Sequence, residues 1–135
     1  HMAVTPNKLI LPQGVENGVA SLVATTPVTS RANIVGTAGL VLLKSAMPNG
    51  GKIYEILWVG LGTTLPATLF IWRFDGITAR LFDEMQILGA PDYYFAPTEH
   101  GRREYDNLVL DSTEQLFCSV SAANDINVFA ACSKF

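Results

Sequence analysis

Charged side chains are scarce in this chain. Only 16% of its 135 residues are Asp, Glu, Lys or Arg, against about 25% in a typical soluble domain. Nine Lys and Arg stand against twelve Asp and Glu, which gives a net charge of −3. Binding to a nucleic-acid backbone needs clustered basic residues, so nucleic acid is excluded as an expected partner. A surface so poor in charge favours a protein partner that covers part of it.

Long apolar runs are missing as well. No stretch approaches the ~20 apolar residues of a membrane span, so we expect no membrane partner. No charged and then apolar leader opens the sequence, and we expect no export signal. The first two residues, His1-Met2, look like a cloning remnant. One basic cluster, at 100–103, is followed at once by acidic residues, and we expect it to lie in a solvated loop.

Cysteine is too scarce for a disulfide scaffold, because Cys118 and Cys132 are the only two. Each alternates with apolar neighbours, so we expect two buried free thiols that pack as small hydrophobic groups. A bridge stays open as an alternative, since a hairpin of the last two strands would place both sulfurs on one face.

Side chains that bind metals or cofactors are few. His100 is the only histidine besides His1, which makes a zinc site unexpected. A calcium site built from Asp83, Glu84 and Asp92 stays open, although exposed carboxylates that keep the surface soluble are the simpler interpretation. No phosphate-binding loop occurs in the sequence. We therefore expect neither a metal nor a cofactor.

Catalytic motifs are also lacking. The sequence holds no Gly-x-Ser-x-Gly motif, and its serines stand in plain strand or turn contexts. An enzyme that uses His100 with Glu99 or Glu104 is the one formal option, because a nucleophile needs a nearby general base. We expect that the protein is not an enzyme.

Alternating apolar residues and turn signals predict an all-β fold. Apolar spacing of three and four never persists long enough for a helix. We expect about eight strands, at intervals near the 8 to 12 residues typical of a sandwich or barrel. The predicted architecture is an antiparallel two-sheet β-sandwich of jelly-roll type. The predicted strands are 19–25, 33–43, 53–61, 69–74, 80–87, 108–110, 115–122 and 126–135.

Several connections are predicted from their turn residues. Pro48-Asn49-Gly50-Gly51 is the strongest turn signal, Asp75-Gly76 indicates a short hairpin, and 123–125 is expected to join the last two strands as a hairpin. A loop of twenty residues, 88–107, is expected before the strand at 108–110, and loops this long are often functional.

Two of these strands carry large side chains on both faces. In 53–61 both alternating sets are large, so we expect cover on both sides, by a second sheet and a loop or by another subunit. In 69–74, Phe70, Trp72 and Phe74 share one face.

The chain is expected to form one domain, 19–135, preceded by a cloning remnant and an extended arm at 1–18. Prolines and glycines forbid a helix in the arm, which carries the apolar residues Leu9, Ile10 and Leu11. A neighbouring subunit could order it, and a disordered terminus or a first edge strand of the same domain stays open.

A series of short motifs follows in order through the centre of the chain: Gly36-Thr37-Ala38-Gly39, Asn49-Gly50-Gly51-Lys52-Ile53, Thr63-Thr64, Leu69-Phe70-Ile71 with Asp75-Gly76, and Arg80-Leu81-Phe82. This order resembles the small β-sandwich structural proteins of tailed bacteriophages, the decoration or head-auxiliary proteins. The similarity extends to the end of the chain, where 110–116 resembles the family's polar turn into the penultimate strand and 126–131 resembles its last strand, and it covers about 100 residues. The arm and the long aromatic loop depart from the family's pattern.

The resemblance implies a non-enzymatic virion structural protein, assembled in the host cytoplasm, that binds and stabilises the phage head. Its implied partners are the major capsid protein and further copies of itself, with a trimer as the expected oligomer. The expected contact residues are Leu9, Ile10 and Leu11 of the arm and Tyr93, Tyr94 and Phe95 of the loop.

The alternative is a phage tail or fibre module that binds a glycan on the host surface. It needs Trp58, Trp72, Tyr54 and Tyr94 to face outward, whereas aromatic residues at alternating strand positions are more often core.

Overall fold

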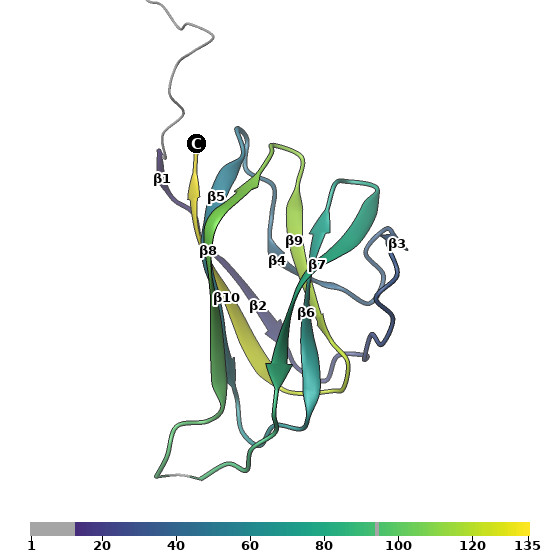
Figure 1. Cartoon of the computed structure of the whole chain (residues 1–135), viewed down its shortest axis with the longest axis vertical. Coiled ribbons are helices and arrows are strands. Elements are labelled where there is room, and N and C mark those ends of the chain that lie inside the picture. Colours follow the sequence, from purple (N-terminus) through teal and green to yellow (C-terminus); the bar gives the residue numbers. More distant parts are fainter. Residues whose placement is uncertain (1–12, 94) are drawn as a thin grey trace, which may run out of the picture.

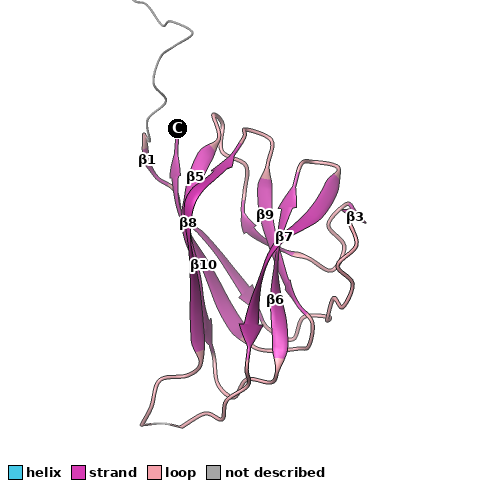
Figure 2. Ribbon diagram, in the orientation of Figure 1, coloured by secondary structure: helices cyan, strands magenta, loops and turns pink. Residues whose placement is uncertain are grey.

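Two antiparallel sheets of five strands each face one another in the computed structural model, which describes residues 13–93 and 95–135 (Figure 1). The first sheet contains β1 (Gly14–Val15), β2 (Gly18–Leu22), β5 (Gly51–Gly60), β8 (His100–Leu110) and β10 (Ile126–Lys134). The second contains β3 (Ile34–Val35), β4 (Val41–Lys44), β6 (Ala67–Phe74), β7 (Thr78–Ile87) and β9 (Gln115–Val120). The described residues form strands and loops, with no helix that could cross a membrane (Figure 2).

The strand order confirms the predicted fold class. Without the two-residue strands β1 and β3, the first sheet runs β2-β10-β5-β8 and the second runs β4-β9-β6-β7. This order is that of an eight-stranded jelly roll. The total is ten strands where about eight were expected, because β1 extends the edge beside β10 and the predicted strand 33–43 is divided. Gly36 and Gly39, both with positive φ, separate its two parts, β3 and β4.

The predicted hairpin of the last two strands is wrong. β9 pairs with β4 and β6 in the second sheet, while β10 pairs with β2 and β5 in the first, so residues 121–125 cross between the sheets. Cys118 and Cys132 therefore lie on different sheets, and both are buried free thiols, as the sequence predicted. Burial raises the pKa of the Cys118 thiol to about 12 and that of Cys132 to about 11.

The core lies between the sheets, and a second apolar cluster lies on the outer side of the second sheet. The main cluster is built from the inward side chains of both sheets, Trp58, Ile71 and Val128 among them. Phe70 and Trp72 form the centre of the outer cluster, and residues from segment 23–40 cover them. Strand β6 is therefore buried on both faces, because the chain folds its own segment 23–40 over it.

Segment 23–40 is held on β6 and β7 by polar contacts as well. Arg31 lies 5.3 Å above the ring of Phe70 and forms a bidentate ion pair with Glu84, with the shortest N···O distance 2.8 Å. Within the cluster, Nε1–H of Trp72 donates to Oγ of Ser119 at 2.9 Å. A buried indole N–H with an acceptor avoids the cost of an unpaired polar group.

Strand β5 is covered on one face within this chain. A bulge between Ile53 and Glu55 changes its alternation, so Ile53, Ile56 and Trp58 all point into the core. On the outer face Tyr54 is exposed and Leu57 is half-buried. Within one chain only one face of β5 is covered, so the prediction that a second sheet and a loop cover both faces is wrong. Cover of the outer face by another subunit remains a prediction.

The predicted twenty-residue loop is shorter, because β8 begins at His100 and the loop spans 88–99. The cluster His100–Arg103 was expected in a loop and lies instead on this edge strand. Arg102 pairs with Glu55 of β5 and with Glu104 of its own strand. This polar stretch lacks the alternating apolar residues from which a strand is predicted. Charges along a free edge discourage pairing with another sheet.

Side chains close the two sides of the sandwich. At the β2–β4 side, buried Lys44 forms an ion pair with Glu16 at 3.1 Å. At the β7–β8 side, the hydroxyl of Tyr105 donates to Asp83 at 2.6 Å, and burial together with this carboxylate raises the pKa of Tyr105.

Candidate contact surfaces

Three connections meet at one end of the sandwich, at the bottom of Figure 1: 61–66, 88–99 and 121–125. Thr64 and Ala90 exchange backbone hydrogen bonds of 2.9 and 3.1 Å, which tie the first two connections together. The buried side chain of Asn124 reaches from the third, accepting from the N–H of Leu65 at 2.7 Å and donating to its carbonyl at 3.1 Å. We call this assembly the loop end.

The carboxylate of Glu99 fixes the base of loop 88–99. It accepts hydrogen bonds from the hydroxyl of Thr64 at 2.5 Å, from the N–H of Leu88 at 2.8 Å and from the N–H of Gly89 at 3.0 Å. Burial raises the pKa of Glu99, but these three bonds together outweigh it and hold the pKa below its usual value. The carboxylate therefore has a structural role.

Beyond this base, loop 88–99 presents an aromatic pair to solvent. Phe95 is 89% exposed and Tyr93 52% exposed, and their rings stack with centroids 5.6 Å apart and an interplanar angle of 27°. Figure 2 shows the loop projecting past the ends of the strands. Tyr94, the third predicted contact residue of this loop, lies outside the described residues. The structure thus places Tyr93 and Phe95 where a partner could reach them.

Three exposed leucines lie at the same end, and no sequence pattern identified them as a group. Leu61 and Leu65 belong to connection 61–66, and Leu88 begins loop 88–99. Each stands beside polar or turn residues in the sequence, and only the fold places the two connections at one end of the sandwich. Exposed apolar groups gathered in one place mark interaction sites more often than single ones do.

A second uncovered surface lies on the outer face of the first sheet. Val19 of β2, Phe129 of β10 and Leu57 of β5 are direct neighbours across the strands. Val19 is 60% exposed and Phe129 40% exposed. We call these three residues the apolar row. It crosses three strands, so no local sequence pattern could reveal it.

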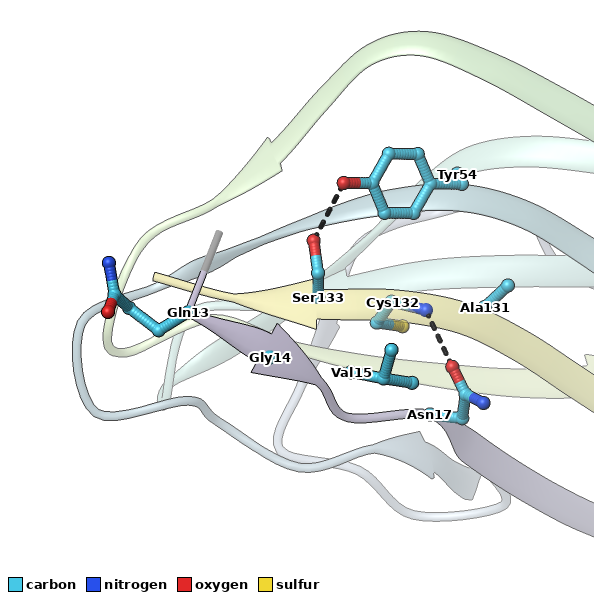
Figure 3. Close-up of a pocket in the computed structure, with 8 residues that line it drawn as sticks. All are labelled: Gln13, Gly14, Val15, Asn17, Tyr54, Ala131, Cys132 and Ser133. Atoms are coloured by element: carbon cyan, nitrogen blue, oxygen red, sulfur yellow. Dashed lines mark hydrogen bonds between the residues drawn. The ribbon is translucent and has the colours of Figure 1, made fainter. Parts of the chain in front are cut away.

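Two shallow hollows beside the apolar row share Asn17 and Ala131. Figure 3 shows the first, with β10 as its floor and Val15 and Tyr54 on either side. Its polar groups bond within the protein: Asn17 accepts from the N–H of Cys132 at 3.0 Å, and the hydroxyls of Tyr54 and Ser133 lie 2.8 Å apart. We call the two hollows together the β10 groove.

The predicted contact residues Leu9, Ile10 and Leu11 lie outside the described residues. The part of the predicted arm that is described ends beside this groove. Gln13 lines it, and Gly14 and Val15 pair with Lys134 and Ser133 as strand β1. The alternative of a first edge strand in the same domain therefore holds for Gly14–Val15.

The residues considered for chemistry lie apart. His100 is exposed at the start of β8, with its Nδ1 3.3 Å from the carbonyl of Thr98, while Glu104 pairs with Arg102. Asp83 is bonded to Tyr105, and Glu84 to Arg31. Within 13–93 and 95–135, no three His, Cys, Asp or Glu side chains are grouped to hold a metal ion.

The aromatic residues on which a glycan site would depend are mostly unavailable. Trp58 and Trp72 are both buried, one in each apolar cluster, which removes the main support for a stacking platform on the strands. Tyr54 is exposed, but Nζ of Lys52 lies 5.2 Å from its ring centroid.

Known proteins offer no guide to these surfaces. Comparison of the chain finds no matching family model, no matching curated protein and no matching solved structure, so the two surfaces themselves carry the functional argument.

Proposed function

We propose that this chain is a non-enzymatic structural protein of a bacteriophage virion, a decoration protein that docks onto the head through its loop end. The observation that carries the proposal is the stacked pair Tyr93 and Phe95, exposed on a loop whose base is fixed. Aromatic side chains contribute most to binding when they enter a pocket on a partner, and a fixed base limits the conformational entropy lost on docking.

The charge pattern supports contact in place of chemistry. Glu99, the carboxylate at the base of the loop, is occupied by three hydrogen bonds. Leu61, Leu65 and Leu88 are exposed at the same end, together with the carboxylate residue Asp92 beside Tyr93, so the loop end offers apolar area with some polar residues in it. Protein interfaces combine apolar and aromatic residues with polar ones in this way.

The proposed partners are the major capsid protein, for the loop end, and further copies of this chain, for the outer face of the first sheet. A trimer is the proposed oligomer, located in the virion. The jelly roll is a fold that viral capsid proteins use, which agrees with this assignment as a matter of architecture.

Co-sedimentation with empty heads tests the docking. The heads are assembled from the major capsid protein of the phage or prophage genome that carries this gene. The wild-type chain is expected to pellet with them, and Phe95→Ser is expected to reduce the bound fraction at least tenfold, since exposed aromatic anchors carry much of the energy of an interface.

The matched control is Ile77→Ser. Ile77 is also strongly exposed, but it lies in the turn between β6 and β7, at the opposite end of the sandwich. This variant should bind like the wild type. Equal binding by Phe95→Ser and the wild type would refute docking through the loop end, and absence of wild-type binding would refute the head as the partner.

A further inference from the structure

The chain covers the outer face of one sheet and leaves that of the other open. On the second sheet, segment 23–40 buries Phe70 and Trp72. On the first sheet, the apolar row and the β10 groove have no such cover from the described residues, and Val15 beside them is 77% exposed. An exposed apolar surface of this kind, on an otherwise well-packed sheet, indicates an interaction site.

The groove favours an apolar occupant. Ala131, a small side chain, lies on its floor, and Tyr54, Leu57 and Phe129 stand around it. The side chains of Asn17, Tyr54 and Ser133 already bond within the protein, so the groove gains little from a polar ligand. A short run of aliphatic side chains matches this lining.

Such a run occurs in the twelve residues that precede the described chain. Leu9, Ile10 and Leu11 are consecutive, and the described chain begins at Gln13, on the rim of the groove. Leu9 lies four residues before Gln13, so an extended chain carries it at most about 14 Å from Gln13, enough to reach the groove of a neighbouring molecule that packs beside this one.

The direction of the chain points away from its own groove. Gln13 N–H donates to the carbonyl of Lys134 at 2.6 Å, and Gly14 already pairs with Lys134, the last residue of β10. At Gln13 the described chain therefore runs toward the end of β10 and away from the groove.

We propose that the segment Leu9–Leu11 of one copy packs into the β10 groove of a second copy. This inference rests on the self-association proposed above and names the contact that produces it. Each chain then gives a segment and receives one, so the exchange closes as a symmetric dimer or continues around a ring such as a trimer.

Cysteine trapping between two different chains tests the exchange. One chain carries Ile10→Cys, and a second, larger tagged chain carries Ala131→Cys, on the exposed floor of the groove. The two are refolded together and oxidised. The native thiols should not compete, because Cys118 and Cys132 are buried with pKa values raised to about 12 and about 11. We expect a disulfide-linked product that contains both chains.

The matched control pairs Ile10→Cys with Leu61→Cys, an exposed residue at the loop end, and should give at least tenfold less linked product. Equal yields from the two pairs overturn the inference. A single chain that carries both Ile10→Cys and Ala131→Cys adds a second criterion: a bridge formed mainly within one chain overturns the exchange, because the segment then occupies its own groove.

Sedimentation of the full chain separates this inference from the proposal beneath it. A wild-type monomer refutes self-association and the exchange together. An oligomer that persists when Leu9, Ile10 and Leu11 are all replaced by Ser refutes the exchange alone and leaves self-association to another surface. An oligomer that dissociates in this variant, with the melting temperature of the monomer domain retained, supports the exchange.

Discussion

Glu99 offers the most direct test of how the loop end is built. Glu99→Ala removes the acceptor of three hydrogen bonds. Water can replace it at Leu88, which is exposed, but not at the hydroxyl of Thr64, which is buried. A buried donor left unpaired costs about 1–3 kcal/mol. We expect most of this cost to appear in the local opening of the loop base.

Native-state hydrogen exchange measures that opening. The amide of Thr64 donates to the carbonyl of Ala90, and the amide of Ala90 donates to both the carbonyl and the hydroxyl of Thr64. Neither amide contacts Glu99 directly, so their protection reports the junction that its carboxylate supports. In Glu99→Ala we expect their protection factors to fall about tenfold to hundredfold, which corresponds to about 1.4–2.7 kcal/mol. Unchanged protection at both amides would refute the idea that Glu99 stabilises the loop base.

A conservative variant and pH give independent checks. Glu99→Gln keeps one carbonyl oxygen, so its effect should be smaller than that of Glu99→Ala. The pKa of Glu99 is held below its usual 4.5, so the contribution of its charge is complete above that pH. It is lost as the pH falls through the lowered pKa. Wild-type protection at Thr64 and Ala90 should therefore decline in acid toward that of the variant.

Three further substitutions test packing and charge. Gly101→Ala would place a Cβ 2.5 Å from Nε1 of buried Trp58, and urea denaturation should show a loss of about 1–3 kcal/mol in the free energy of unfolding. Ser119→Ala leaves Nε1–H of Trp72 without its acceptor, at a cost of about 1–3 kcal/mol in the same assay. Asp75 has its pKa lowered from 3.8 to about 2, by backbone hydrogen bonds in its turn and by an ion pair. The stability difference between wild type and Asp75→Asn should therefore shrink as the pH falls through this range, measured by thermal unfolding.

Each of these expectations has a control variant or a result that would contradict it. Gly62→Ala adds a methyl group whose nearest neighbour lies 3.8 Å away, so it should change stability by less than about 0.5 kcal/mol. Equal effects at Gly62 and Gly101 would argue against the close approach to Trp58. Ser21→Ala removes an exposed hydroxyl and serves as the control for Ser119→Ala. A stability difference for Asp75→Asn that stays constant across the acid range would contradict the lowered pKa.

The sequence was sufficient for the strands that alternate and for the turns that carry Gly. Asp75-Gly76 joins β6 and β7 as a hairpin, and Phe70 and Trp72 share a buried face. The prediction from sequence was wrong where the length of a loop indicates one pairing and the strand order of the whole fold requires another. The short connection at 123–125 has the length of a hairpin loop, yet it crosses between sheets, because the jelly-roll order places β9 and β10 on opposite layers.

Edge strand β8 was predicted only at its end, 108–110, for a related reason. Its Arg102 and Glu104 stand on a solvent-facing edge, where alternation of apolar residues is not needed. The candidate surfaces divide in the same way. Tyr93 and Phe95 could be singled out because they are aromatic and adjacent in a loop. The row of Val19, Leu57 and Phe129 depends on the register of three strands and cannot be read from any one of them.

The pairing of Gly14 with Lys134 brings the first described strand and the last strand together at the end opposite loop 88–99 (Figure 1). A protein fused after Phe135 would therefore project away from the loop end and leave the docking side clear. If loop 88–99 does face the head, such a fusion would be displayed on the outside of every decorated particle, which makes the chain a carrier for antigens or enzymes.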